Sequence, residues 1–170
     1  MKETPAGTAL TFHWNYIGLP VAILLFSVVL TAFFYPRLPA EVAYRFQPDG
    51  SPDNWGGKGA VILWTLLPQL LLTLVAGGIA RGITGLIARL IKGQSTWMKP
   101  EIIISLMANM IALPQSILFF AMLDIFSYNS YQIHLLPLWV FALIVLVTGG
   151  IIIGIFFFRA VWQFWIASKE

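Results

Sequence analysis

The sequence predicts an all-α integral membrane protein with four transmembrane helices. Of its 170 residues, 59% are apolar and only 10% are charged, whereas a soluble globular domain usually has about a quarter of its residues charged. The apolar residues are also gathered into four long runs. Each run is close to the roughly 20 helical residues needed to cross a hydrocarbon core of about 30 Å. We therefore expect a multi-pass protein of the cell (plasma or inner) membrane.

The four expected spans are joined by three loops. The spans cover residues 17–35, 60–80, 102–123 and 137–158. The first apolar run exceeds the roughly 7–15 residues of a signal-peptide core, and it lacks small residues at the cleavage spacing. We expect it to be an uncleaved anchor. Because the number of spans is even, both termini should lie on the same side of the membrane.

Lysine and arginine are distributed unevenly between the two sides. Seven of the ten lie in the N-terminal segment, the second loop or the C-terminal tail: Lys2, Arg81, Arg89, Lys92, Lys99, Arg159 and Lys169. The third loop, taken as Asp124 to Leu136, has none. Because basic loops usually stay in the cytoplasm, this pattern predicts cytoplasmic N and C termini. The first loop, residues 36–58, should then face the periplasm or the extracellular space.

The outer loop at residues 36–58 is expected to be an ordered cap. It contains six charges that balance to zero, so it cannot lie in hydrocarbon. Four prolines and the Asp49-Gly50 pair predict several turns. Between the turns, apolar Val42, Tyr44 and Phe46 alternate with other residues, which predicts a short extended piece with one apolar face.

Charged and aromatic residues of the outer loop are the candidates for recognition of a ligand or partner. They are Arg37, Glu41, Arg45, Asp49, Asp53, Trp55 and Lys58. Asp49 and Asp53 are near enough in sequence to share a calcium or magnesium ion. Because aspartates are far commoner as turn formers than as such ligands, we predict no metal and no other cofactor.

Residues 82–93 form a basic amphipathic segment. Apolar residues recur at helical spacing, while Arg89 and Lys92 project elsewhere. The segment is expected either to lie on the inner leaflet or to prolong the second span; a protein-binding helix is the alternative. The net charge of +3 fits attraction to anionic lipid. The predicted partners are therefore the lipid bilayer and other membrane proteins or a homodimer, and no nucleic acid.

Polar and small residues inside the spans predict how the helices pack. Gln69 and Asn109 lie on polar faces of spans two and three, which should face neighbouring helices because lipid tails offer no hydrogen bonds. Gly150 and Gly154 have the spacing of a close helix contact, either within the chain or in a homodimer. Pro68 and Pro114 are expected to kink spans two and three.

The residues needed for catalysis or proton transport are missing from the spans. No Asp, Glu, Lys, Arg or His lies within them, whereas pumps and proton-coupled transporters need such groups at membrane depth. The chain has no cysteine, and no nucleophile and base occur at a recognisable spacing. His13 and His134 should lie on opposite sides of the membrane. We predict that the protein is not an enzyme.

The outer loop resembles the signature of a family. The matching residues are Leu38-Pro39, Val42, Phe46, Gly50, Pro52-Asp53, Trp55-Gly56 and Lys58. The family is domain of unknown function (DUF) 1648, found at the front of SdpI-type bacteriocin-immunity membrane proteins, and its pattern reads roughly LPxxIPxHFxxxGxPDxWGSK. Ala43, Arg45 and Gly57 replace its proline, histidine and serine. Because arginine keeps its charge, a pH-sensing or metal-binding role of that histidine does not transfer.

Two functions remain open. The resemblance implies an immunity protein or a receptor for an envelope signal, with the outer loop recognising a toxic peptide or that signal. The alternative is a non-catalytic accessory subunit of a larger membrane complex, in which the polar helix faces and the loop are docking surfaces.

Overall fold

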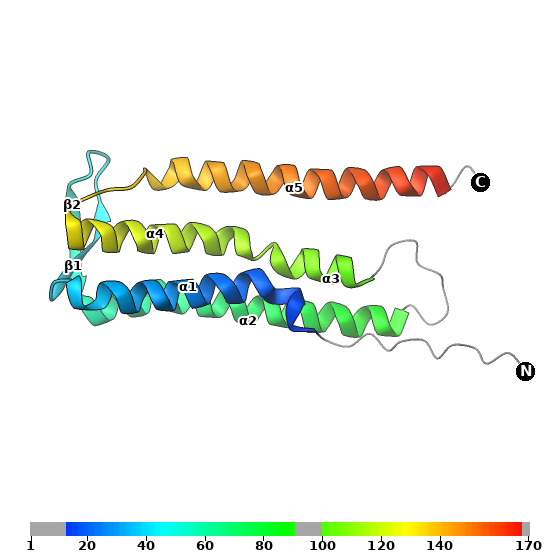
Figure 1. The fold of residues 1–170 in the computed structure, drawn as a ribbon, viewed down its shortest axis with the longest axis horizontal. Coiled ribbons are helices and arrows are strands. Elements are labelled where there is room, and N and C mark those ends of the chain that lie inside the picture. The colour runs from blue at the N-terminus through cyan, green and yellow to red at the C-terminus, as the bar shows by residue number, and fades with distance from the viewer. Residues whose placement is uncertain (1–12, 91–99, 168–170) are drawn as a thin grey trace, which may run out of the picture.

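The structure is a computed structural model that describes residues 13–90 and 100–167. Its helices run side by side, and a two-stranded β-hairpin covers one end of them (Figure 1). In chain order the elements are η1 (Trp14–Ile17), α1 (Gly18–Phe34), η2 (Tyr35–Arg37), β1 (Glu41–Phe46), β2 (Pro52–Gly57), α2 (Lys58–Leu90), α3 (Pro100–Asn109), α4 (Ala112–Tyr131) and α5 (Leu138–Ala167).

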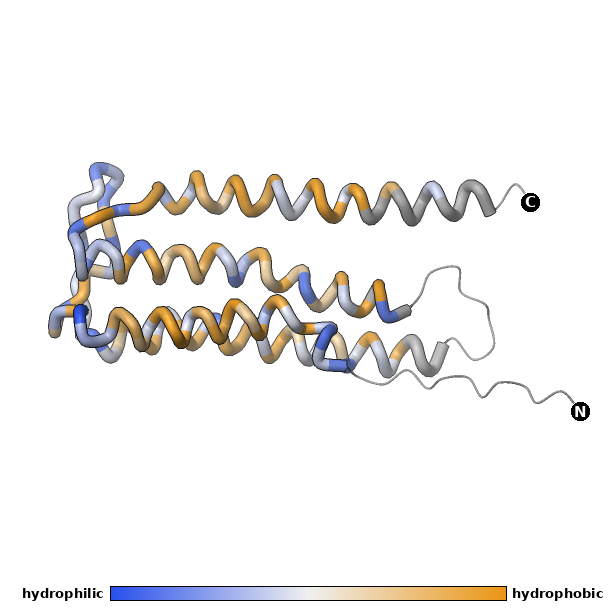
Figure 2. The backbone as a smooth tube through the Cα atoms, in the orientation of Figure 1, coloured by the Kyte–Doolittle hydropathy of each residue, from blue (hydrophilic) through white to orange (hydrophobic). Residues whose placement is uncertain are grey.

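Four helical segments are long and apolar enough to cross a membrane by length and composition. They are Trp14–Arg37, Lys58–Leu86, Ile104–Tyr131 and Leu138–Ile155. Hydrophobic residues follow the helices, while hydrophilic residues gather at the hairpin end (Figure 2). A helix satisfies its own backbone hydrogen bonds, so this arrangement suits hydrocarbon. The predicted class, an all-α multi-pass membrane protein, is confirmed.

The second span continues further than the sequence suggested. Helix α2 runs without interruption through Pro68 and on to Leu90. The first part of the amphipathic segment, residues 82–90, therefore prolongs this span, which is one of the two arrangements expected for it. Residues 91–93 of that segment lie outside the described part of the chain.

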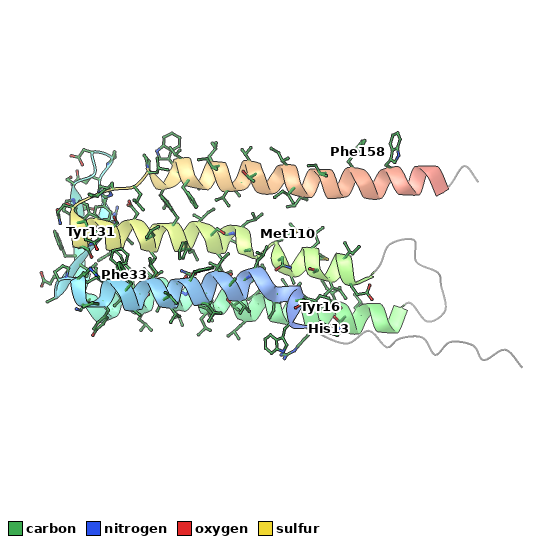
Figure 3. All side chains as sticks on the ribbon, viewed as in Figure 1. His13, Tyr16, Phe33, Met110, Tyr131 and Phe158 are labelled. Atoms are coloured by element: carbon green, nitrogen blue, oxygen red, sulfur yellow. The ribbon has the colours of Figure 1, made fainter. Side chains whose placement is uncertain are left out.

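The third span is interrupted between α3 and α4, at Met110 and Ile111 (Figure 3). The cause lies one turn later in the sequence, because Pro114 has no N–H to donate to the Met110 carbonyl. The Leu113 N–H donates to that carbonyl instead, at 3.1 Å. The interruption thus falls where Pro114 predicts a kink.

Buried polar side chains join α1, α2 and α4. The Ser27 hydroxyl donates to Gln69 Oε1 at 2.6 Å. Gln115 Nε2 donates to the Pro20 carbonyl at 3.0 Å and to Thr73 Oγ1 at 3.1 Å. Both glutamine side chains are fully buried. Because lipid cannot replace these partners, the hydrogen bonds fix how the three helices sit against one another.

The remaining predicted packing residues are Asn109, which makes a contact between helices, and Gly150 and Gly154, which lie on an exposed face. Asn109 Oδ1 accepts a hydrogen bond from the Leu19 N–H at 3.1 Å, which joins α3 to α1. Gly150 and Gly154 are exposed, and a Cβ added at either would meet nothing within 4 Å. The close helix contact within the chain is instead at Gly149, where an added Cβ would lie 2.6 Å from Leu113 Cδ2. Within residues 13–90 and 100–167, Gly150 and Gly154 therefore make no such close contact with another helix.

Candidate functional site

The loop at residues 36–58 folds into an antiparallel β-hairpin. Its turn is closed by the Gln47 N–H, which donates to the Ser51 carbonyl at 2.8 Å, and it includes Gly50 at φ +85°. This positive φ suits glycine because it has no Cβ. The expected alternation of apolar and other residues is only partly correct. Val42 and Ala43 are both fully buried, because Val42 packs in the apolar cluster beneath the hairpin while the backbone of Ala43 lies against Asn129 of α4.

Asn129 of α4 holds the hairpin on the helices. Its Oδ1 accepts a hydrogen bond from the Ala43 N–H, and its Nδ2 donates to the Ala43 carbonyl, both at 2.8 Å. The amide thus pairs with β1 as a neighbouring strand would. Its Nδ2 also donates to the Ile125 carbonyl at 2.8 Å. One side chain therefore satisfies two polar backbone groups that would otherwise be buried without partners.

His134 makes a second attachment, at the turn of the hairpin. Its Nδ1 lies 3.1 Å from Asp124 Oδ2, and its Nε2 lies 3.1 Å from the Gly50 carbonyl oxygen. The ring stacks on Tyr128 at 4.5 Å and meets the edge of Phe46 at 4.7 Å, measured between ring centroids. Both nitrogens face acceptors, so an imidazolium donates to both and a neutral ring to only one. His13 lies far from this contact, near the start of α1 (Figure 3).

Apolar side chains fill the space beneath the hairpin. One buried cluster joins the two residues that flank η2 to β1, α2 and α4. It consists of Phe34, Leu38, Val42, Val61, Met122 and Phe126. Burial of this apolar surface, together with the two polar attachments, makes the hairpin part of the folded helical domain.

Two of the predicted recognition residues interact with the C-terminal end of α1. Lys58 Nζ donates to the Tyr35 carbonyl at 3.0 Å and to the Leu38 carbonyl at 3.2 Å. These carbonyls follow the C-terminal end of α1, where a positive charge is favourable. The Arg37 guanidinium lies 4.1 Å from the centre of the Phe33 ring. Both cations therefore have structural partners.

Four others shape the surface of the hairpin. Arg45 Nε pairs with Asp53 Oδ2 at 3.2 Å, but both side chains are exposed, so the pair stabilises the fold by at most about 1 kcal/mol. Asp49 Oδ1 accepts hydrogen bonds from the Ser51 hydroxyl and the Ser51 N–H. The hydroxyl, followed by the N–H, lowers the pKa of Asp49 below its usual value. Glu41 is exposed at the start of β1.

Trp55, the seventh predicted residue, lines a pocket between the hairpin and α2. The pocket has a volume of about 380 Å³ and a mainly apolar lining. Its walls include Tyr44 and Trp55 from the hairpin, Ala60, Trp64 and Thr65 from α2, and Ile125 from α4. The Thr65 hydroxyl is directed to the helix backbone, because it lies 3.0 Å from the carbonyl oxygens of Val61 and Ile62.

The arrangement suits binding of an apolar group. Volumes of about 300–1,000 Å³ are usual for ligand pockets. Across residues 13–90 and 100–167, no cluster of three or more His, Asp or Glu side chains could hold a metal ion. Sequence reasoning found Trp55 and missed Tyr44, Trp64 and Ile125. The available signal was that two tryptophans flank the start of the second span, within reach of one membrane interface.

The four apolar helices and their polar cap define a multi-pass membrane protein. Residues 22–68 match the model of the family described as Domain of unknown function (DUF1648). The match covers most of α1, the whole hairpin and the start of α2, so it confirms the resemblance and shows that the chain carries a DUF1648 domain. Neither a curated protein nor a solved structure matches the chain.

Proposed function

We propose that this protein is an immunity protein or envelope-signal receptor whose hairpin recognises an apolar group at the outer surface of the cell membrane. The observation that supports this most strongly is the aromatic pocket. Six residues that line the pocket were named above, and all of them except Ile125 lie within residues 22–68, the segment that matches DUF1648. The function is binding and not catalysis.

The orientation needed for this function follows from charge. Most lysines and arginines lie on the side of the termini, which supports a cytoplasmic position for that side and a position outside the cell membrane for the hairpin. The hairpin would then be the first part of the protein to meet a molecule arriving from outside.

The attachments of the hairpin favour binding. Asn129 and His134 hold it at two places, at Ala43 and at Gly50. The pocket walls therefore need little ordering when a ligand enters, and a preorganised site binds more tightly than a flexible one. This argument favours recognition over a purely structural cap.

Replacing Trp55 by alanine is expected to abolish the protective function while leaving membrane insertion unchanged. The substitution removes a large apolar wall of the pocket, and such aromatic anchors often account for most of a binding energy. The test is complementation of a gene-deletion strain, challenged with a panel of membrane-active peptides and envelope stresses. Wild type should restore resistance at least tenfold better than Trp55→Ala.

Trp139→Ala is the matched control for that experiment. Trp139 lies in the first turn of α5, near the hairpin end, and is 71% exposed, but it does not line the pocket. It should complement as wild type does. A deletion strain with unchanged sensitivity to the whole panel would refute the receptor proposal, as would full complementation by Trp55→Ala.

An accessory role in a larger complex is the second candidate, and helix α5 favours it. Among the described elements, α5 packs substantially against α4 alone. Its sides near Gly150 and Gly154 are exposed and offer the close approach that a neighbouring helix needs. Gentle detergent extraction followed by native mass measurement separates the candidates: a complex with a different protein supports the accessory role, and a monomer or homodimer opposes it.

A further inference from the structure

We infer that the pocket under the hairpin holds one hydrocarbon chain of a bilayer lipid. The inference concerns the pocket on which the proposed receptor function rests, and it names a membrane lipid, not a peptide from outside the cell, as the resident occupant of that pocket. It rests on three features of the pocket: the chemistry of its lining, its depth in the membrane, and its continuity with the lipid-facing surface of α2.

The lining favours a hydrocarbon ligand. Its surface is mainly apolar, and the side chains that build it are aromatic or aliphatic except for Thr65. The Thr65 hydroxyl already has backbone acceptors within its own helix. No lysine, arginine, aspartate or glutamate is among the lining residues. A charged headgroup would therefore lose its hydration without gaining a charged partner, whereas an acyl chain loses nothing.

The depth of the pocket also suits an acyl chain. Helix α2 starts at Lys58, whose ammonium group binds carbonyls at the end of α1 and so marks the polar boundary. Trp64 lies six residues further, which is about 9 Å along the helix axis at 1.5 Å per residue. The pocket thus extends from the boundary into the hydrocarbon region. Tryptophan and tyrosine are enriched at this level of membrane proteins.

The surface around the pocket is already a lipid surface. Trp64 is 70% exposed, and its neighbours Leu63 and Leu67 are also exposed on a helix long and apolar enough to cross the membrane. When α2 spans a bilayer, hydrocarbon therefore lies next to the mouth of the pocket. A water-soluble peptide would instead have to pass the hairpin residues Tyr44 and Trp55. The volume of about 380 Å³ has room for part of one chain and not for a whole lipid.

The absence of cysteine from the chain allows a test with the folded protein. Ala60, which lines the pocket, is replaced by cysteine and then labelled after folding with a bulky maleimide. Gly59→Cys is the matched control, because Gly59 is the preceding residue, is exposed and does not line the pocket. Each protein is reconstituted in vesicles of palmitoyl-oleoyl phosphatidylglycerol and phosphatidylcholine, transferred to detergent, and examined by native mass spectrometry.

We expect wild type, unlabelled Ala60→Cys and labelled Gly59→Cys each to retain one lipid. Labelled Ala60→Cys should retain at least tenfold less. A lipid with a diazirine in its acyl chain should cross-link to the peptide containing Ala60 to Thr65, and the label should abolish that adduct. Equal retention by the labelled Ala60→Cys and Gly59→Cys proteins would overturn the inference.

A peptide ligand would give a different result. If an amphipathic peptide in detergent free of added lipid protects Ala60→Cys from the maleimide, and phosphatidylglycerol does not, the inference is wrong. Failure of the receptor proposal would appear separately, as an unchanged growth phenotype of the deletion strain.

Discussion

Replacing Asn129 by leucine is expected to detach the hairpin from α4 and to lower the free energy of unfolding by about 2–4 kcal/mol. The substitution removes both partners of Ala43, whose backbone N–H and carbonyl would stay buried without hydrogen bonds. Hydrogen exchange at the Ala43 amide is the direct measurement. Its rate should rise at least tenfold, since this amide donates to the deleted side chain.

Ser130→Ala is the control for Asn129→Leu. Ser130 is the next residue of α4, and its buried hydroxyl has no hydrogen-bond partner. Its loss should leave Ala43 exchange unchanged and alter the free energy of unfolding by no more than about 0.5 kcal/mol. Equal exchange in the two variants would mean that Asn129 does not hold the hairpin.

Replacing Gly149 by leucine is expected to push α5 away from α4 and to destabilise the packing by about 1–3 kcal/mol. Even a Cβ at this position would lie 2.6 Å from Leu113 Cδ2, which is closer than side-chain atoms approach one another. The stacking of Phe120 on Phe141, with ring centroids 4.0 Å apart, joins the same two helices and should weaken as well. The measurement is the midpoint of unfolding by sodium dodecyl sulfate in mixed micelles.

Gly150→Leu provides the comparison for Gly149→Leu. Both substitutions replace glycine by leucine within the same helix, so the gain in helix propensity, about 0.8 kcal/mol, is common to both. A Cβ at Gly150 meets nothing within 4 Å, so the midpoint of unfolding of this variant should equal that of wild type or lie at a slightly higher proportion of sodium dodecyl sulfate. Equal midpoints of unfolding for the two variants would refute the close contact between α4 and α5 at Gly149.

Long apolar runs made the membrane class predictable, but they did not predict where the helix of the third span ends. The sequence suggested a span ending at Leu123 and a loop from Asp124, whereas α4 continues to Tyr131. Asp124 and Asn129 are polar, and their low hydropathy is typical of loop residues. In the structure they bond to the His134 segment and to the hairpin, so this end of α4 carries polar groups without exposing them fully.

The site could be predicted only in part, because its contacts join distant parts of the chain. The turns of the hairpin and Trp55 follow from local sequence. The contact of His134 with Gly50 joins residues 84 apart, and the contact of Asn129 with Ala43 joins residues 86 apart. The alternation argument also failed locally at Ala43, because Ala43 is buried against Asn129, a residue distant in the sequence.

The side of the membrane on which the hairpin lies is the premise of the proposed function, and cysteine labelling in intact cells tests it most directly. Asn54, exposed in β2, and Ser95, which the sequence places between the second and third predicted spans, are replaced by cysteine one at a time in a chain that otherwise has none. A membrane-impermeant maleimide should label Asn54→Cys in intact cells and Ser95→Cys only after permeabilisation. The opposite pattern would place the hairpin in the cytoplasm and contradict an outward-facing receptor.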